Sequence, residues 1–221
     1  PSPVLSRAAD HHKDQTYFLY RLHPQWLHQL LFPVGELQKS AVWEEAEALG
    51  LPADEIKESQ EICFVTQGDY RTFIGQELPT AKKPGLFIDE AGLPLGQHNG
   101  IAFYTPGQRR GLGIATGQRL YVQRVNPSTN TVLLGPKEAL LKNECTVSDL
   151  NLLDPRLAQC QTEVHVKLRY ATPATPATVS PLDAASLSIR FHHPQRAISP
   201  GQSAVLYEGD AILGGGIIQP F

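Results

Sequence analysis

Three cysteines are the side chains of this chain best suited to covalent chemistry. Cys63 follows the polar run 58–61 and has an apolar residue on each side. A cysteine is a nucleophile only where its surroundings stabilise the thiolate, and free cysteines are also common as small core residues. Cys63 is therefore a candidate sulfur nucleophile, with a buried structural cysteine as the alternative. Cys145 and Cys160 lack CxxC or Cys/His ligand spacing, so we expect no zinc site.

A glycine-rich segment, residues 107–113, is a candidate for binding phosphate. Its adjacent Arg109 and Arg110 have suitable charge and donors, and its three glycines permit positive φ angles. The spacing matches neither the GxGxxG fingerprint of dinucleotide-binding folds nor the P-loop. The alternative is a chain turn with solvated arginines.

Two further groups of residues are suited to contacting a nucleic acid. Lys13, Asp14 and Gln15 precede an aromatic helix, where Gln15 can read a base edge. Asp14 could instead cap that helix. Arg169 and Tyr170, at a strand end, offer a phosphate contact and a ring for stacking. A core aromatic residue beside a surface arginine is the alternative for this second pair.

The elements that position these residues are predicted to be helical in the first third of the chain and mostly β afterwards. Residues 16–31 predict two short helices separated near Pro24, and Ser40 is the expected cap of a helix that ends at Gly50. Another short helix is expected over 70–78. Strands are expected at 62–65, 86–88, 101–104, 120–125, 131–134, 163–170, 177–179, 186–191, 203–207 and 211–218. The short, regular turn spacing predicts an α+β fold, mostly β, with a small closed or nearly closed barrel.

Composition limits the classes of protein to which the chain can belong. With 221 residues, 41% apolar and 19% charged, it is long enough for a real core and is neither disordered nor a coiled coil. No apolar run is long enough for a membrane helix. A net charge of −3 does not favour nucleic-acid binding, although residues 67–135 carry seven Lys and Arg against four Asp and Glu. The odd cysteine count favours a reducing compartment such as the cytoplasm. Because the chain contains no methionine, we expect a fragment or a processed product.

Several segments, taken in order, resemble the tRNA-specific 2-thiouridylases, which install sulfur on the wobble uridine of tRNA. The resemblance covers essentially the whole chain and rests on motifs of known order: KDQTYFL at 13–19, FPVGEL at 32–37, ICFV at 62–65, GQHNG at 96–100, YTPGQRRGLG at 104–113, SPGQSAV at 199–205 and GGGII at 214–218. It implies that residues 1–66 are the helical end of a catalytic domain. Residues 67–135 would form a small β-rich central domain and residues 136–221 a C-terminal antiparallel β-barrel.

The resemblance also implies roles for individual residues. Cys63 would carry sulfur as a persulfide received from a relay protein, and would form a disulfide with a second cysteine that this chain lacks. ATP and Mg²⁺ would be bound by a domain absent from this chain, which would be inactive alone. The RNA would be recognised by its shape and by a splayed-out base. The tRNA-binding residues would be Lys13, Asp14, Gln15, Arg109, Arg110, Arg169, Tyr170 and Gln202.

Two other functions are compatible with the sequence. The chain could be a non-catalytic RNA-binding β-barrel module in which Cys63 is structural. It could also be a cysteine hydrolase that pairs Cys63 with His98, although no orienting third residue or oxyanion motif is evident. In the sulfurtransferase interpretation, Cys63 is expected to be the accessible cysteine, and Cys145 and Cys160 are expected to be barrel residues shielded from reagents.

Overall fold

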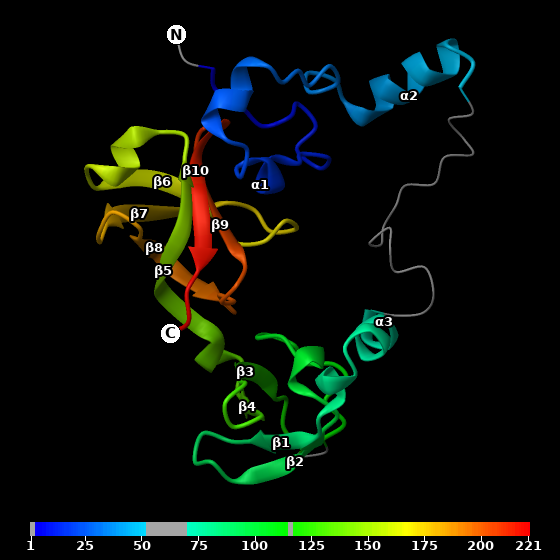
Figure 1. The fold of residues 1–221 in the computed structure, drawn as a ribbon, viewed down its shortest axis with the longest axis vertical. Helices are drawn as coiled ribbons and strands as arrows, with labels where there is room; N and C mark the ends of the chain where they lie inside the picture. The colour runs from blue at the N-terminus through cyan, green and yellow to red at the C-terminus, as the bar shows by residue number, and fades with distance from the viewer. Residues whose placement is uncertain (1–2, 52–69, 115–116) are drawn as a thin grey trace. The chain divides into compact units, whose positions relative to one another are not determined.

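The structure, a computed structural model, describes residues 3–51, 70–114 and 117–221, and divides the chain into two compact units (Figure 1). Unit 1 comprises residues 1–57, 143–194 and 200–221. Unit 2 comprises residues 58–142 and 195–199. The strand expected at 62–65 and Cys63 itself lie outside the described residues.

Unit 1 begins with a segment of short helices that are separated near Pro24. Helix α1 (Thr16–Leu19) and the 3₁₀ helix η1 (Pro24–His28) are separate, as expected, because His23 is extended and the proline starts the second helix. Helix α2 (Lys39–Ala48) begins one residue before Ser40, so the expected serine cap is wrong. Gly50, at φ 71°, follows its end as expected.

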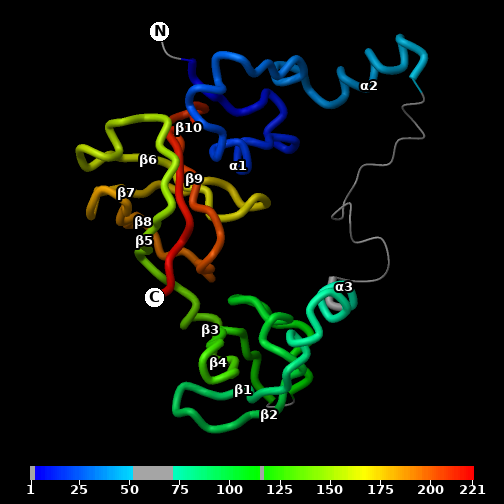
Figure 2. Tube along the Cα trace, in the orientation of Figure 1, coloured from blue at the N-terminus to red at the C-terminus, as the bar shows by residue number. Residues whose placement is uncertain are grey.

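A closed six-stranded barrel forms the rest of unit 1, and the tube view traces its strands (Figure 2). The strands neighbour one another in the order β10-β5-β8-β7-β6-β9. The barrel and the mixed sheet of unit 2 confirm the expected mostly-β α+β class. The strands are β5 (Leu141–Leu152), β6 (Thr162–Lys167), β7 (Thr175–Pro181), β8 (Leu187–Arg196), β9 (Ser203–Glu208) and β10 (Ala211–Ile218); η5 (Pro155–Ala158) joins β5 to β6.

The helical segment is attached to the barrel by backbone and side-chain hydrogen bonds. Ile212 N donates to Leu5 O at 2.9 Å, and Asn151 Nδ2 donates to the carbonyl oxygens of Tyr20 and Leu22. The rings of Tyr17 and Tyr20 are buried in one apolar cluster with residues of β9 and β10. Residues 3–28 therefore cannot be separated from the barrel without exposing part of its core.

Unit 2 is a four-stranded mixed sheet in the order β2-β1-β4-β3. β1 and β4 are parallel, and the other pairs are antiparallel. A core of Phe87, Val122, Val132 and Leu134 lies on the sheet. The elements are α3 (Tyr70–Glu77), η2 (Pro79–Lys82), β1 (Gly85–Ile88), β2 (Pro94–His98), η3 (Ile101–Phe103), β3 (Tyr121–Asn126), β4 (Thr131–Gly135) and η4 (Glu138–Leu140). The strand expected at 101–104 is wrong, because a 3₁₀ turn occupies most of it.

Candidate nucleic-acid interface

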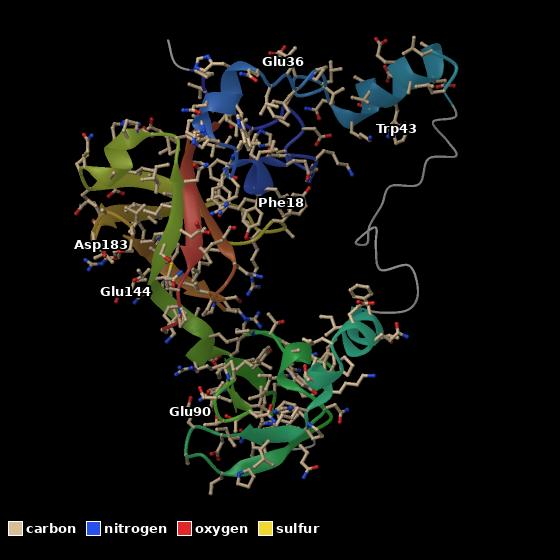
Figure 3. The ribbon with its side chains drawn as sticks, in the orientation of Figure 1. Phe18, Glu36, Trp43, Glu90, Glu144 and Asp183 are labelled. Atoms are coloured by element: carbon tan, nitrogen blue, oxygen red, sulfur yellow. The ribbon has the colours of Figure 1, made fainter. Side chains whose placement is uncertain are left out.

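Gln15 and Tyr170, 155 positions apart in sequence, meet on the surface of unit 1. Gln15 Nε2 donates to the Tyr170 hydroxyl at 2.7 Å. The Tyr170 ring stacks on Phe18 of α1, with centroids 5.3 Å apart and planes inclined by 28°. Phe18 is 57% exposed and Tyr170 37% exposed, and Figure 3 shows Phe18 on α1. The three side chains form an exposed platform, the 15/18/170 platform, with apolar rings beside a polar amide.

Asp14 differs from its two neighbours because its carboxylate points into the fold. It accepts hydrogen bonds from Thr16 Oγ1 at 2.7 Å and from Thr16 N at 3.1 Å, and the side chain is 3% exposed. A buried carboxylate with these donors fixes the backbone where α1 begins. The N-cap of α1 is Gln15 and makes no side-chain capping bond, so the expected cap at Asp14 is wrong and Asp14 forms an Asx turn just before the helix. Lys13 and Gln15 are exposed.

The hydroxyl of Tyr17 contacts the backbone beside both Arg169 and Gln202. Tyr17 donates to Ser203 O at 3.0 Å and also lies 3.3 Å from Leu168 O. Arg169 follows Leu168 and Gln202 precedes Ser203. Both expected contact residues are therefore next in sequence to residues that Tyr17 of α1 contacts. Burial raises the pKa of Tyr17, and the nearby Arg169 charge opposes that rise.

Gln202 carries an unusual feature for a half-buried amide. Its Oε1 is buried and has no hydrogen-bond partner. A buried acceptor left unpaired costs about 1–3 kcal/mol.

Arg109 and Arg110 lie in unit 2 and are both exposed. Gln108 organises their loop, since its Nε2 donates to Arg110 O at 2.9 Å and its backbone carbonyl accepts from Val122 N at 2.9 Å. Gly107 and Gly111 take φ angles of 89° and 73°, which only glycine adopts readily. The loop is an ordered turn that presents two guanidinium groups to solvent. This arrangement fits both a phosphate-binding segment and a chain turn with solvated arginines.

His98 is a structural residue of unit 2. Its Nδ1 accepts from Gly100 N at 3.1 Å, and its Nε2 lies 3.2 Å from Asn130 O. The ring is 1% exposed, and burial lowers its pKa. With both nitrogens engaged and the ring buried, His98 is not placed to act as the base of a cysteine hydrolase.

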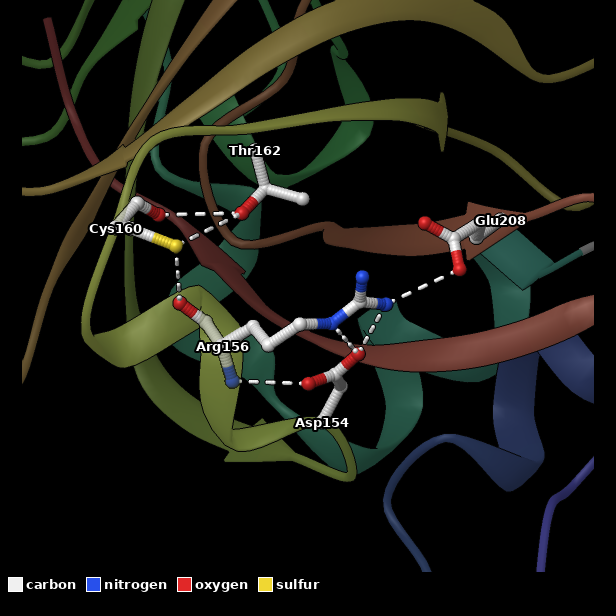
Figure 4. Close-up of polar contacts among 5 residues, drawn as sticks. All are labelled: Asp154, Arg156, Cys160, Thr162 and Glu208. Atoms are coloured by element: carbon white, nitrogen blue, oxygen red, sulfur yellow. Dashed lines mark hydrogen bonds and ion pairs between the residues drawn. The ribbon is translucent and has the colours of Figure 1, made fainter.

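The two described cysteines differ from each other in exposure. Cys145 is buried, and burial raises its pKa to about 12. Cys160 is exposed, which makes the expected shielding wrong for this residue. Cys160 follows η5, and Figure 4 shows its Sγ donating to Arg156 O, at 3.5 Å. The Arg156 guanidinium joins this turn to Asp154 and to Glu208 on β9.

Phe18, Arg7 and Lys167 line or adjoin this surface but were not predicted as contacts. Phe18 lies three positions after Gln15 on a helix, a spacing that places two side chains on one face. Lys167 and His165 take alternate positions of β6, opposite to the buried Val164 and Val166. No sequence signal indicates that Arg7 approaches Lys167, because they are 160 positions apart.

Comparisons with known proteins cover nearly the whole chain. Three family models match in succession: a tRNA methyl transferase HUP domain at residues 2–67, a tRNA methyl transferase PRC-barrel domain at 71–136, and an aminomethyltransferase beta-barrel domain at 142–218. Among the described residues, no helix is both long and apolar enough to cross a membrane, and no three His, Cys, Asp or Glu side chains gather as metal ligands.

Similar curated proteins carry one name. The chain is 43% identical over 216 residues to the tRNA-specific 2-thiouridylase MnmA of Pelotomaculum thermopropionicum, covering 98% of this chain and 59% of that protein. Proteins of the same name from Roseiflexus castenholzii and Clostridium perfringens are 42% and 40% identical, each over 97% of this chain. The chain covers 58% and 60% of these two proteins, so it spans about three fifths of the length of the relatives it matches.

Proposed function

This chain belongs to the tRNA-specific 2-thiouridylase family, and from that premise we propose that it serves the 2-thiolation of tRNA wobble uridine. Its part is to provide a tRNA-binding surface on the barrel and, at Cys63, the cysteine that carries sulfur. The observation that supports the first part most is the 15/18/170 platform, in which an exposed amide and two exposed rings from distant segments form one surface.

The platform suits RNA better than duplex DNA. Sequence-specific RNA recognition uses unstacked bases, which stack on aromatic rings and form hydrogen bonds through their edges. The ring faces of Phe18 and Tyr170 supply stacking, and the Gln15 amide supplies a polar edge. Lys13, Arg169 and the exposed pair Arg109 and Arg110 supply the phosphate contacts that set affinity and register.

Cys63 supplies the covalent chemistry of the proposal. Its thiolate attacks the outer sulfur of a persulfide carried by a relay protein, the S–S bond of that persulfide breaks, the relay thiolate leaves, and a persulfide forms on Cys63. The terminal sulfur then attacks C2 of the uridine, whose oxygen is activated as an adenylate, and the C2–O bond breaks as AMP leaves. A second cysteine attacks the Cys63 sulfur and breaks the S–S bond, so the transferred sulfur stays on the uridine and the two cysteines end as a disulfide. A persulfide is the suitable carrier because a thiolate is both a good nucleophile and a good leaving group in such exchanges.

ATP and Mg²⁺ are the co-reactants expected from the family resemblance, and we infer that residues outside this chain bind them. The glycine-rich loop 107–113 does not fit nucleotide phosphates. Among the described residues, the element that follows it is strand β3, whereas nucleotide phosphates bind at the N-terminus of a helix. Activation of the uridine oxygen is therefore assigned to those outside residues and not to this loop. A cytoplasmic location and a relay protein as partner belong to the same proposal.

Two measurements on the chain test the proposal. We expect Cys63 to form a persulfide when incubated with a sulfur-loaded relay protein, read by peptide mass spectrometry, while exposed Cys160 remains the matched control. We expect tRNA to bind, and Gln15→Ala to weaken binding more than Gln25→Ala, an exposed glutamine on η1. Binding without any persulfide on Cys63 would favour the non-catalytic RNA-binding module instead, and absence of both would overturn the proposal.

A further inference from the structure

An open pocket of about 800 Å³ lies beside Tyr170 on unit 1. Its walls come from the segment before α1, from the outward face of β6, from the loop 170–174 and from the β9–β10 turn. This volume falls within the range of about 300–1,000 Å³ typical of small-molecule sites. The pocket is therefore large enough to receive a nucleotide-sized group.

Two cationic side chains in this pocket lie against aromatic rings. The guanidinium carbon of Arg7 lies 4.1 Å from the Tyr207 ring centroid, and Lys167 Nζ lies 5.5 Å from the Tyr170 ring centroid. Arg7 Nε is buried and has no hydrogen-bond partner. A cationic side chain that packs on an aromatic ring is already oriented, so it loses less conformational entropy on binding an anion than an unrestrained side chain does.

The two cations are also close enough to influence each other. Burial lowers the pKa of Lys167, and the Arg7 charge lowers it further, while Asp14 opposes both effects. Two partly desolvated cations that repel each other are stabilised by an anion placed between them.

The remaining titratable groups of the pocket do not exclude an anion. Asp14 is engaged by Thr16 through both oxygens. The other groups are the carboxylate of Asp210 and the three histidines His11, His12 and His165. The N–H groups of these imidazole rings can donate hydrogen bonds to a phosphate, so they are compatible with the same preference.

We propose that Arg7 and Lys167 hold a backbone phosphate of bound RNA in this pocket, next to the 15/18/170 platform. The inference rests on the proposed function for the identity of the ligand, because the pocket chemistry alone specifies a phosphate group. A phosphate seated beside Tyr170 fixes the register of the strand whose base stacks on the platform. Phosphate contacts position a nucleic acid in this way, whereas base contacts specify it.

The first arm of the test uses inorganic phosphate on the 221-residue chain. The Nε–H resonance of Arg7 should shift saturably in a phosphate titration, and the shift should diminish in Lys167→Gln. The Nε–H resonance of Arg190, an exposed arginine on β8, is the internal control and should show no saturable shift. Absence of a saturable shift at Arg7, or an equal one at Arg190, overturns the pocket.

The second arm uses tRNA and measures how the binding constant depends on salt. Arg7→Gln and Lys167→Gln should each reduce the slope of log K against log salt, and the double variant should reduce it by about 0.7–0.9, the value for the one phosphate contact that the two side chains share. Arg190→Gln should leave the slope unchanged. If Arg7→Gln fails to fold because it packs on Tyr207, Lys167→Gln still decides the point.

The two arms separate this inference from the proposed function. An unchanged slope in a chain that binds tRNA overturns the phosphate pocket and leaves the proposed function standing. A chain that does not bind tRNA contradicts the proposed function, and the phosphate titration then decides whether the pocket binds free phosphate. A saturable phosphate site with an unchanged RNA slope shows a site for free phosphate and overturns the assignment to RNA.

Discussion

Replacing Tyr170 by phenylalanine and by leucine separates the two contributions that this side chain makes to the interface. Tyr170→Phe removes the hydroxyl that accepts from Gln15 Nε2 at 2.7 Å and keeps the ring on Phe18. Such a hydrogen bond contributes about 0.5–1.5 kcal/mol. Because Gln15 is exposed and its amide can bind water instead, we expect the lower end, a loss of tRNA affinity of about two- to fourfold.

Tyr170→Leu removes the ring as well. Stacking of a base on an aromatic side chain contributes about 1–3 kcal/mol, so the affinity for tRNA should fall by about five- to 150-fold. Fluorescence anisotropy with labelled tRNA at several salt concentrations measures both variants. The slope of log K against log salt should stay the same, because no cation is removed.

The control for this pair is Trp26→Leu, which removes another exposed ring of unit 1 outside the platform. It should bind tRNA as the unaltered chain does. Equal affinities for the unaltered chain, Tyr170→Phe and Tyr170→Leu would show that no base stacks on this ring. A loss in Tyr170→Leu no larger than in Trp26→Leu would refute the reasoning in the same way.

Three further predictions concern stability and reactivity. Gly100→Ala should destabilise unit 2 by more than about 2 kcal/mol in denaturant unfolding, because φ is 137° at Gly100 and a Cβ there would meet a backbone carbonyl. Its control is Gly113→Ala, where φ is 69° and the Cβ would enter open space, so the loss of stability should be about 1 kcal/mol. Iodoacetamide should label exposed Cys160 well before buried Cys145, whose pKa of about 12 keeps it protonated; equal labelling would contradict this burial. Burial lowers the folded-state pKa of His98, so the unfolded chain binds the proton more readily than the folded chain. The contribution of His98 to stability is therefore present above about pH 6.5 and is lost as the pH falls through the folded-state pKa. His98→Asn should remove that part of the pH dependence of thermal unfolding.

Alternation made part of the barrel predictable. A strand was expected at 163–170, and in β6 Val164 and Val166 are buried while His165 is exposed, the period of two typical of a strand with one face on the core. The 12-residue strand β5 was missed because polar residues surround its two clearly inward positions, Cys145 and Val147. Its strand conformation depends on pairing with β10 and therefore on barrel closure, which a local pattern does not express.

The 3₁₀ turn at 101–103 was missed for a different reason. Its apolar residues match a strand pattern, but the preceding Gly100 takes a φ of 137° and its N–H donates to His98. A side-chain hydrogen bond that turns the chain gives no hydrophobic period to detect.

The candidate interface was predictable residue by residue but not as a surface. Gln15 and Tyr170 were both expected to contact RNA, and closure of β6 against β9 places them in hydrogen-bond contact. The inward turn of Asp14 depends on Thr16, and the approach of Arg7 to Lys167 depends on the bridge between Ser6 and Ala211. Such long-range contacts follow from topology and not from spacing in the sequence.

The central claim, that Cys63 carries the transferred sulfur, is tested most directly by thiolation of tRNA in the active enzyme that carries this sequence. Cys63→Ser should abolish formation of 2-thiouridine, measured by nucleoside mass spectrometry, and should leave tRNA affinity unchanged, since serine has no sulfur to transfer. Cys160→Ser, which alters the exposed cysteine of the barrel unit, is the matched control and should retain activity. Retained thiolation in Cys63→Ser would contradict the account.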